Sequence, residues 1–527
     1  MDRSNLATLE ETARRLRSLV DANPARHRPD FAASLNNLSV ALAGAGRRKD
    51  ALAAIEEAVE LRRQLAAEDP TTYLADLAAS LNNLAIQLSE VGRRKDALAA
   101  IEEAVELRRQ LAAEDPTTYL ADLAASLNSL SNRLAEVGRP RDALAAIEEA
   151  VELRRQLAAE DPTTYLADLA ASLNNLAIQL GDVGRHEDAL TAIEKAVMIR
   201  RELAEVRPDA YLPELAGSLN NLSVQLRDAG RGDDALKAVV QASQRYRELA
   251  EARPDVYLPD LAVSLNNLSV QMSAMGQRED ALAAIEEAVR QYRALAAVTP
   301  DAFLPKLAGS LNNLSLQLST VGRREHALAA VEEATKHYRQ LVAADPAAFL
   351  PDLARSLNTL SNRLSDVGRP EDALRAIEEA VAIRRRLAAT APEAFSPDLA
   401  GSLNNLANRL SGVGRREEAL AAIQEAVTHY RRLAEAMPDA YVPDLARSLN
   451  NLSNRLSGVG RREEALAAIQ EAVAIRRRLA EAMPDAYLPD LARSQRLLAQ
   501  ILADLGREEE AARVLADVED FFGVEDG

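Results

Sequence analysis

A repeat of 46 residues runs through almost the whole chain. The string SLNNL, with its variants SLNSL and SLNTL, recurs without insertion or deletion, and one further step reaches Arg496 in a degenerate copy. A fixed period of about 20 to 50 residues is the sequence signature of a solenoid, whose units bury their apolar faces against their neighbours. The chain is therefore expected to form one array of about eleven units. The first asparagine of the string stands at Asn36, Asn82, Asn128, Asn174, Asn220, Asn266, Asn312, Asn358, Asn404 and Asn450.

Each copy of the repeat predicts a pair of helices. In the second copy, leucines recur at spacings of three and four residues from Leu77 to Leu88 and form the apolar stripe of a first helix, helix A. Gly92 is expected to end helix A, because glycine tolerates the positive φ of a helix C-terminus. Apolar residues then recur along a second helix, helix B, until Asp115 and Pro116 end it.

Later copies carry a further proline, which we expect at the start of helix A. A proline in the first turn of a helix costs nothing, because the N–H that it lacks would have no partner there. The first four of these prolines are Pro213, Pro259, Pro305 and Pro351.

The composition favours helices that pack closely. Hydrophobic residues make up 48% of the chain, aromatic residues only 3%, and there is no tryptophan. Helix axes approach to the short end of about 8–10 Å only where the contact positions are small. Ala97 and Ala104 on helix B are expected to be such positions. The predicted fold is an all-α, right-handed α-solenoid of about eleven 46-residue helix-turn-helix repeats.

The repeat also sets the expected domain organisation. Residues 1–30 are predicted to hold an N-terminal half repeat, with helix B only, and a linker. Ten full repeats occupy residues 31–490. The degenerate last repeat and an acidic C-terminal cap occupy residues 491–527.

Charge and cysteine content exclude several functions. The net charge of −18 disfavours binding to nucleic acid, because an acidic surface repels phosphate. No cysteine is present, so disulfides, thiolate nucleophiles and cysteine-ligated zinc are all excluded. No apolar run is long enough for a signal sequence or a membrane span. We expect a cytoplasmic protein that binds neither nucleic acid nor membrane.

No catalytic, cofactor-binding or metal-binding residue is predicted. The five histidines are scattered, and neither an HExxH string nor a glycine-rich phosphate loop occurs. Glu102 and Glu103 recur on helix B, with Arg108 and Arg109 one or two turns later. Because this pattern repeats in many copies, we interpret it as a solvated face with local ion pairs. The chain is not expected to be an enzyme.

The strings LNNLS, LNNLA and LNSLS, followed by Gly, Ala and Ala at offsets such as Gly92, Ala97 and Ala104, resemble the tetratricopeptide repeat. The resemblance is strongest to the longer variety of kinesin light chains and covers residues 5 to 520. Arrays of this composition also resemble those of high-GC bacteria such as actinomycetes. The usual unit of the family is shorter, so its superhelical pitch does not transfer to a 46-residue unit.

The resemblance implies that helix A lines a concave groove with four positions per repeat. In the second copy these are Ala79, Asn82, Asn83 and Ile86. An asparagine amide both donates and accepts, so it can hold the backbone of a peptide. Alternatively, the asparagines bond to neighbouring helices and fix their register. The predicted groove asparagines are Asn82, Asn83, Asn128, Asn174, Asn175, Asn220, Asn221, Asn266, Asn267, Asn312, Asn313, Asn358, Asn404, Asn405, Asn450 and Asn451.

The other two groove positions change character along the chain. In copies four to seven they are small or apolar, as with Ile178 and Leu316, whereas later copies carry Asn362, Asn408 and Asn454 and the arginines Arg355, Arg447 and Arg493. Arginine binds both oxygens of a carboxylate. We therefore expect a protein or peptide segment with apolar anchors in the middle and an acidic or C-terminal carboxylate group near the arginines. The alternative is that these positions lie on a solvent-exposed face and vary without a functional reason.

Three functions fit this pattern. The first is a protein-interaction scaffold that binds a partner segment in the groove. The second is a structural protein that self-assembles as a homo-oligomer through lateral solenoid packing. The third is a regulator that senses a small ligand, for which the sequence offers no convergent polar group. No cofactor is expected for any of them.

Overall fold

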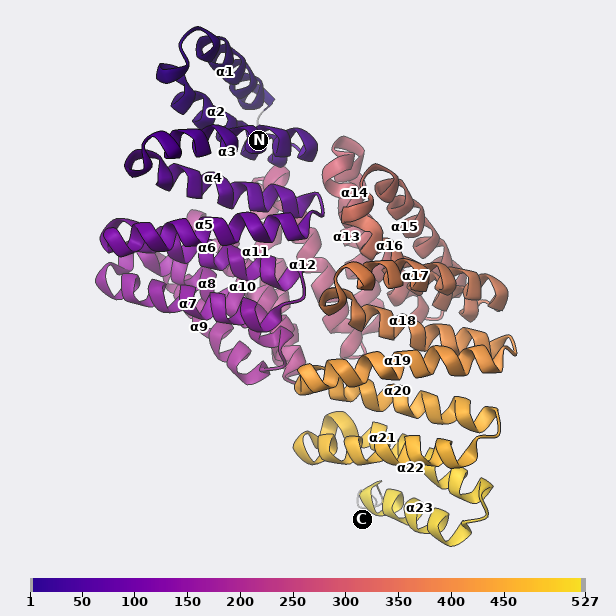
Figure 1. The fold of residues 1–527 in the computed structure, drawn as a ribbon. Coiled ribbons are helices and arrows are strands. Elements are labelled where there is room, and N and C mark those ends of the chain that lie inside the picture. The colour runs from indigo at the N-terminus through magenta and orange to yellow at the C-terminus, as the bar shows by residue number, and fades with distance from the viewer. Residues whose placement is uncertain (1–2, 523–527) are drawn as a thin grey trace. The chain divides into compact units, whose positions relative to one another are not determined.

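Helices alone make up the secondary structure of residues 3–522, which are the residues that the computed structural model describes. The chain divides into two compact units, residues 1–353 and 354–527, and the division falls within α16 (Pro346–Asp366). In each unit a helix lies beside the next helix of the chain, so that helices A and B alternate (Figure 1). The array is an α-solenoid, as the repeat predicts.

The A helices are the even-numbered ones. They are α2 (Pro24–Gly44), α4 (Pro70–Glu90), α6 (Pro116–Glu136), α8 (Pro162–Asp182), α10 (Pro208–Asp228), α12 (Pro254–Ala274), α14 (Pro300–Thr320), α16, α18 (Pro392–Gly412), α20 (Pro438–Gly458) and α22 (Pro484–Asp504).

The B helices are the odd-numbered ones. They are α1 (Arg3–Ala22), α3 (Arg48–Glu68), α5 (Arg94–Glu114), α7 (Pro140–Glu160), α9 (His186–Val206), α11 (Gly232–Ala252), α13 (Arg278–Val298), α15 (Arg324–Ala344), α17 (Pro370–Thr390), α19 (Arg416–Ala436), α21 (Arg462–Ala482) and α23 (Glu508–Phe522).

The A helices begin five residues earlier than the sequence predicts. Each starts at the proline that was expected only to end the preceding B helix, so Pro208 opens α10 and Pro213 lies inside it. A proline at the first helical position loses no hydrogen bond, and the same ring disfavours helix in the residue before it. The linker expected within residues 1–30 is not seen as such, because α2 already begins at Pro24 for the same reason.

Capping side chains mark the start of several A helices. Asp69 precedes α4, and its carboxylate accepts hydrogen bonds from the backbone N–H of Thr72 and from the hydroxyls of Thr71 and Thr72. These bonds lower the pKa of Asp69. Because they satisfy N–H groups that have no partner within the helix, they fix where the A helix starts.

Glycines mark the end of each A helix, as predicted. Gly92 has a φ of 77°, and the backbone N–H of Arg93 donates to the carbonyl oxygen of Leu88 at 2.9 Å. The N–H of Gly92 donates to the carbonyl of Ser89, which completes a Schellman motif. A side chain at this φ would be strained, so glycine is the residue that turns the chain from helix A to helix B.

Alanine forms much of the core. The side chains of Ala97 and Ala104 on helix B, and of Ala78 and Ala85 on helix A, are fully buried. Leucine and isoleucine fill the space between them, including Leu81 and Ile101. Small side chains allow neighbouring helices to approach closely, as the composition indicates.

Ion pairs join the B helices of adjacent repeats, in addition to local pairs within a helix such as Arg155–Glu152 of α7. Arg109 of α5 pairs with Glu149 of α7 at 2.7 Å, and Arg293 of α13 pairs with Glu333 of α15 at 2.7 Å. In contrast, Arg108 is buried, although the sequence placed it on a solvated face. The solvated face of helix B therefore includes Arg109 but not Arg108.

No helix in the described part of the chain is long and apolar enough to cross a membrane. The acidic residues Glu508, Glu509 and Glu510 form the first turn of α23. Residues 523–527, the end of the expected acidic cap, lie outside the described residues.

Candidate functional site

The predicted asparagines lie on the A helices and contact each other across adjacent repeats. The amide nitrogen of Asn221 in α10 donates to the amide oxygen of Asn174 in α8 at 3.0 Å. The same bond joins the A helices of other neighbouring copies, in both units, as between Asn405 and Asn358. The asparagines thus bond to neighbouring helices, as in the alternative to peptide binding that the sequence left open. We call the surface formed by these asparagines, and by the positions equivalent to Ala171 and Ile178, the A face.

An arginine of helix B, half-buried at Arg200 and buried in several other copies, contacts this asparagine row. Arg200 of α9 donates to the backbone carbonyl of Glu214 at 2.9 Å and to the hydroxyl of Ser218, which in turn donates to Asn174 at 3.3 Å. Arg62, Arg154, Arg384 and Arg476 likewise donate to a backbone carbonyl and to a serine hydroxyl of the A helix in the next repeat. Burial lowers the pKa of these guanidinium groups, and nearby carboxylates oppose that shift.

In the first unit the A face also carries apolar side chains. Ile178 of α8 and Leu316 of α14 are 36% and 47% exposed, whereas Val224 and Val270 are half-buried. Each is followed by a glutamine that is buried, such as Gln179. Apolar side chains that stay exposed beside a hydrogen-bonding row form a surface suited to an amphipathic partner.

In the second unit the equivalent positions are polar. Asn362 accepts a hydrogen bond from Arg409 at 3.1 Å, and Asn408 accepts one from Arg455 at 3.4 Å. Each of these arginines replaces the buried glutamine of the first unit. The sequence analysis predicted the asparagines but missed their arginine partners. The signal was present in the repeat, because wherever the apolar residue becomes asparagine, the glutamine that follows it becomes arginine.

The three predicted carboxylate-binding arginines are exposed. Arg447 pairs with Asp444 of its own helix at 2.6 Å, and Arg493 pairs with Asp490 at 3.0 Å. Arg355 also has an interaction partner. A carboxylate from another protein would therefore compete with an existing ion pair at Arg447 and at Arg493.

One position of helix B alternates between arginine and tyrosine. Tyr246, Tyr292, Tyr338 and Tyr430 stand where other copies have the buried arginine, and burial raises the pKa of Tyr430 to about 12. The hydroxyl of Tyr246 donates to the backbone carbonyl of Pro213 at 3.1 Å. The tyrosine thus contacts the A helix of its own repeat, whereas the arginine contacts that of the next repeat.

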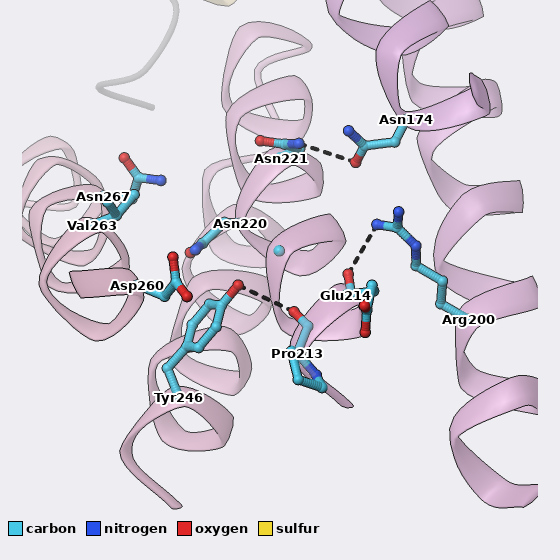
Figure 2. Close-up of a pocket in the computed structure, with 11 residues that line it drawn as sticks. Asn174, Arg200, Pro213, Glu214, Asn220, Asn221, Tyr246, Asp260, Val263 and Asn267 are labelled. Carbon is cyan, nitrogen blue, oxygen red and sulfur yellow. Dashed lines mark hydrogen bonds between the residues drawn. The ribbon is translucent and has the colours of Figure 1, made fainter. Parts of the chain in front are cut away.

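A pocket of about 400 Å³ opens on the A face of the first unit, beside the first of these tyrosines (Figure 2). It lies between Arg200 on one side and Tyr246 and Asp260 on the other, with Asn267 and Val263 of α12 in its wall. Residues from α8 to α12 line it: Asn174, Arg200, Pro213, Glu214, Gly217, Asn220, Asn221, Tyr246, Asp260, Val263 and Asn267. Of the predicted groove asparagines, this pocket brings together Asn174, Asn220, Asn221 and Asn267.

No group of three or more histidine, aspartate or glutamate side chains within the described residues could hold a metal ion. The pocket thus offers hydrogen-bonding and charged groups on helical walls, without a metal-ligand set.

The fold defines a helical-repeat protein whose A helices carry rows of polar and apolar side chains on one face. A tetratricopeptide repeat model matches eight stretches, which together cover more than half of the chain, and a second tetratricopeptide repeat model matches residues 492–517. The chain belongs to the tetratricopeptide repeat family. The eight stretches are residues 31–70, 77–116, 123–162, 169–208, 215–255, 353–389, 399–437 and 445–484.

Several solved structures resemble parts of the chain. The crystal structure of BtubC (BKLC) from P. vanneervenii is 20% identical, with 46% of this chain and 90% of that chain covered and a TM-score of 0.38. A putative kinesin light chain from Podosopora anserina with nearly identical TPR-like repeats is 19% identical, covering 42% and 99%, with a TM-score of 0.34. MamA from Desulfovibrio magneticus RS-1 is 17% identical, covering 42% and 97%, with a TM-score of 0.29. No curated protein sequence matches the chain.

Proposed function

We propose that the chain is a protein-interaction scaffold whose A face in the first unit binds a segment of another protein. Tetratricopeptide repeats generally act as non-catalytic scaffolds that bind protein partners. The observation that carries the proposal is the row of exposed apolar side chains, including Ile178 and Leu316, beside polar asparagines on the same helices. Solvent-exposed apolar side chains gain free energy when a partner covers them.

The arrangement supports a partner that offers both apolar and hydrogen-bonding groups. Asn267 has no hydrogen-bond partner among the described residues, so its amide is available to a ligand. Asn174, in contrast, already accepts from Ser218 and Asn221. The asparagine rows therefore combine a register-fixing role with a small number of available amides, and the apolar side chains supply the contact area.

The experiment is a selection of short random peptides displayed on phage against the full chain, followed by affinity measurements on the synthesised peptides. Ile178→Glu and Leu316→Glu each place a carboxylate in the apolar row. We expect each to weaken the selected peptides by about tenfold, as for an interface anchor. Because both side chains are exposed, the variants retain the fold.

The matched control is Met198→Glu. Met198 lies on the B helix α9 and is 55% exposed, more than Ile178 or Leu316. The variant therefore tests whether a glutamate at any exposed apolar position weakens peptide binding. The proposal fails if the peptides bind the Ile178→Glu and Leu316→Glu variants as tightly as the original chain, or if only Met198→Glu weakens them.

Self-assembly is the competing function, and it predicts a different mass. Light scattering over a wide range of concentrations should give a constant mass near 57.0 kDa if the A face is open to a partner. A mass of two chains or more that rises with concentration, and that falls to one chain in the Leu316→Glu variant, would assign the A face to contacts between copies.

A second binding element for an acidic or C-terminal carboxylate group near Arg355, Arg447 and Arg493 stays a prediction. Its support is the exposure of the three guanidinium groups on A helices. Selected peptides that lose affinity in Arg447→Glu and Arg493→Glu together, but keep it in the lysine variants, would support such an element. A cytoplasmic location also stays a prediction.

A further inference from the structure

One carboxylate in the pocket lacks the partner that its equivalents have. Copies of the repeat carry an aspartate at the position of Asp260, on the sixth residue before the first asparagine of helix A. In the second and third copies this carboxylate lies 4.0 Å and 3.6 Å from the buried arginine of the preceding B helix, as Asp122 does from Arg108. These contacts neutralise its charge.

Later copies neutralise the same carboxylate in another way. In the copy that follows Tyr430, where helix B has tyrosine in place of arginine, the aspartate pairs with an arginine three residues later in its own helix. Asp444 thus pairs with Arg447 at 2.6 Å. The copy that follows Tyr292 has Lys306 in place of the aspartate, so no carboxylate remains there.

Asp260 has neither compensation. The preceding B helix supplies Tyr246, and the residue three positions later is Val263. Among the described residues, Asp260 makes no hydrogen bond and no ion pair. Lys306 of α14 acts on it only at longer range. The Asp260 side chain is exposed at the pocket wall, and its partial desolvation there raises its pKa despite that lysine.

The charges around Asp260 leave an excess of carboxylate. Nη1 of Arg200 donates to the backbone carbonyl of Glu214 and to the hydroxyl of Ser218, and the pocket holds the carboxylates of Asp260 and Glu214 against this one guanidinium. Asn267 faces the same space with an unpartnered amide, and Tyr246 adds an aromatic ring (Figure 2). Such a set suits a ligand that is cationic and rich in donors.

Gly217 provides the room for such a ligand. A methyl group at position 217 would lie 3.3 Å from the hydroxyl oxygen of Tyr246, closer than an ordinary van der Waals contact. The copy with the buried Arg154, in contrast, has alanine at the equivalent position, Ala125. The glycine and the tyrosine together leave a hollow of about 400 Å³.

We propose that this pocket is a subsite for one basic side chain, arginine or lysine, of the partner segment bound on the A face. The inference rests on the proposed scaffold function and adds to it a definite chemical preference at one repeat. The guanidinium or ammonium group would lie between the Asp260 carboxylate and the Asn267 amide, over the ring of Tyr246. The apolar row on the same A helices would bind the rest of the segment.

The test is a double-mutant cycle with a selected peptide. Peptides from the phage selection should be enriched in arginine or lysine at one position, and replacing that residue by citrulline or norleucine should weaken binding to the original chain about tenfold. Asp260→Asn should weaken the unmodified peptide by a similar factor. The same replacement in the peptide should then have no further effect on the Asp260→Asn variant.

Asp122→Asn is the matched control, because Asp122 has the equivalent place on α6 but pairs with Arg108. It should leave peptide affinity unchanged. Peptides that depend on Ile178 and Leu316 but show no basic enrichment, or no coupling to Asp260, would overturn the subsite and leave the scaffold function intact. Asp260-dependent binding of free spermidine without such enrichment would assign the pocket to a small cation and overturn the proposal as well.

Discussion

At the scale of single residues, the repeat provides its own reference state. A side chain that departs from its equivalents is compared with copies that share its helix, its neighbours and its backbone. Asp260 departs because its guanidinium partner is replaced by Tyr246, and no arginine follows it in α12. An unpaired carboxylate in a partly desolvated pocket costs stability, and such a cost is common at binding sites.

Asp260→Asn should therefore stabilise the chain at neutral pH. Partial desolvation at the pocket wall raises the pKa of the exposed Asp260 above its value in the unfolded chain, so the carboxylate destabilises the native state at every pH above the native pKa. This penalty declines as the pH falls through the native pKa and is absent below the unfolded pKa. We expect a higher melting temperature for the variant at neutral pH and no difference in acid.

The control for this prediction is again Asp122→Asn, measured over the same pH range. Removal of the carboxylate beside the buried Arg108 should lower the melting temperature at neutral pH, opposite in sign to the effect at Asp260. A lower melting temperature for Asp260→Asn would show that the carboxylate is compensated after all.

The asparagine rows make a second prediction at this scale. Asn174→Ala removes the acceptor for both Ser218 and Asn221, and the partly buried donors that remain should cost about 1–3 kcal/mol. Asn221→Ala removes one donor only, and its cost should be about 1 kcal/mol or less. Thermal and urea unfolding of the two variants measures this difference. Equal stability in both variants and the original chain would assign the asparagines to partner recognition alone.

At the scale of helices, the fixed period made most of the fold predictable. The pairing of helices, the glycine turns and the alanine contacts all follow from positions that recur every 46 residues. The start of helix A was misplaced because a single residue, such as Asp69, separates α3 from α4, so Pro70 both ends one helix and opens the next. The pattern of apolar residues does not show that the proline which ends helix B also opens helix A.

The candidate site was less predictable because it depends on contacts between repeats. Arg108 has the charge of a surface residue, and its burial follows from an acceptor 14 residues further on, the backbone carbonyl of Asp122. To predict the pocket at Asp260, one would need to know that Tyr246 of α11 and Val263 of α12 lie beside the same carboxylate. Spacing alone does not reveal which positions of α11 and α12 converge.

Close helix packing gives a prediction at the scale of these elements. Ala97 is fully buried on α5, so Ala97→Leu should overpack the contact with the neighbouring helices and cost about 1–3 kcal/mol. Ala99 lies on the same helix and is exposed, so Ala99→Leu should leave the melting temperature nearly unchanged. Similar melting temperatures for the two variants would contradict the role of alanine in the core.

At the scale of the whole molecule, each helix contacts mainly its neighbours in the chain. Stability in such an array is approximately a sum of repeat terms and nearest-neighbour terms. A defect in one repeat should then remain local, and unfolding should not be a single two-state event. This property also permits one copy to give up stability for a binding pocket while the remaining copies keep the array folded.

Hydrogen exchange on the Ala97→Leu variant tests this locality. The substitution should reduce amide protection in α4, α5 and α6, which contact each other, and leave protection in the second unit, residues 354–527, unchanged. The reason is that α5 contacts mainly α4 and α6. Loss of protection by the same factor in α5 and in α19 to α21 would mean that the chain unfolds as one cooperative unit, and the stability cost of Asp260 would then be shared by every repeat.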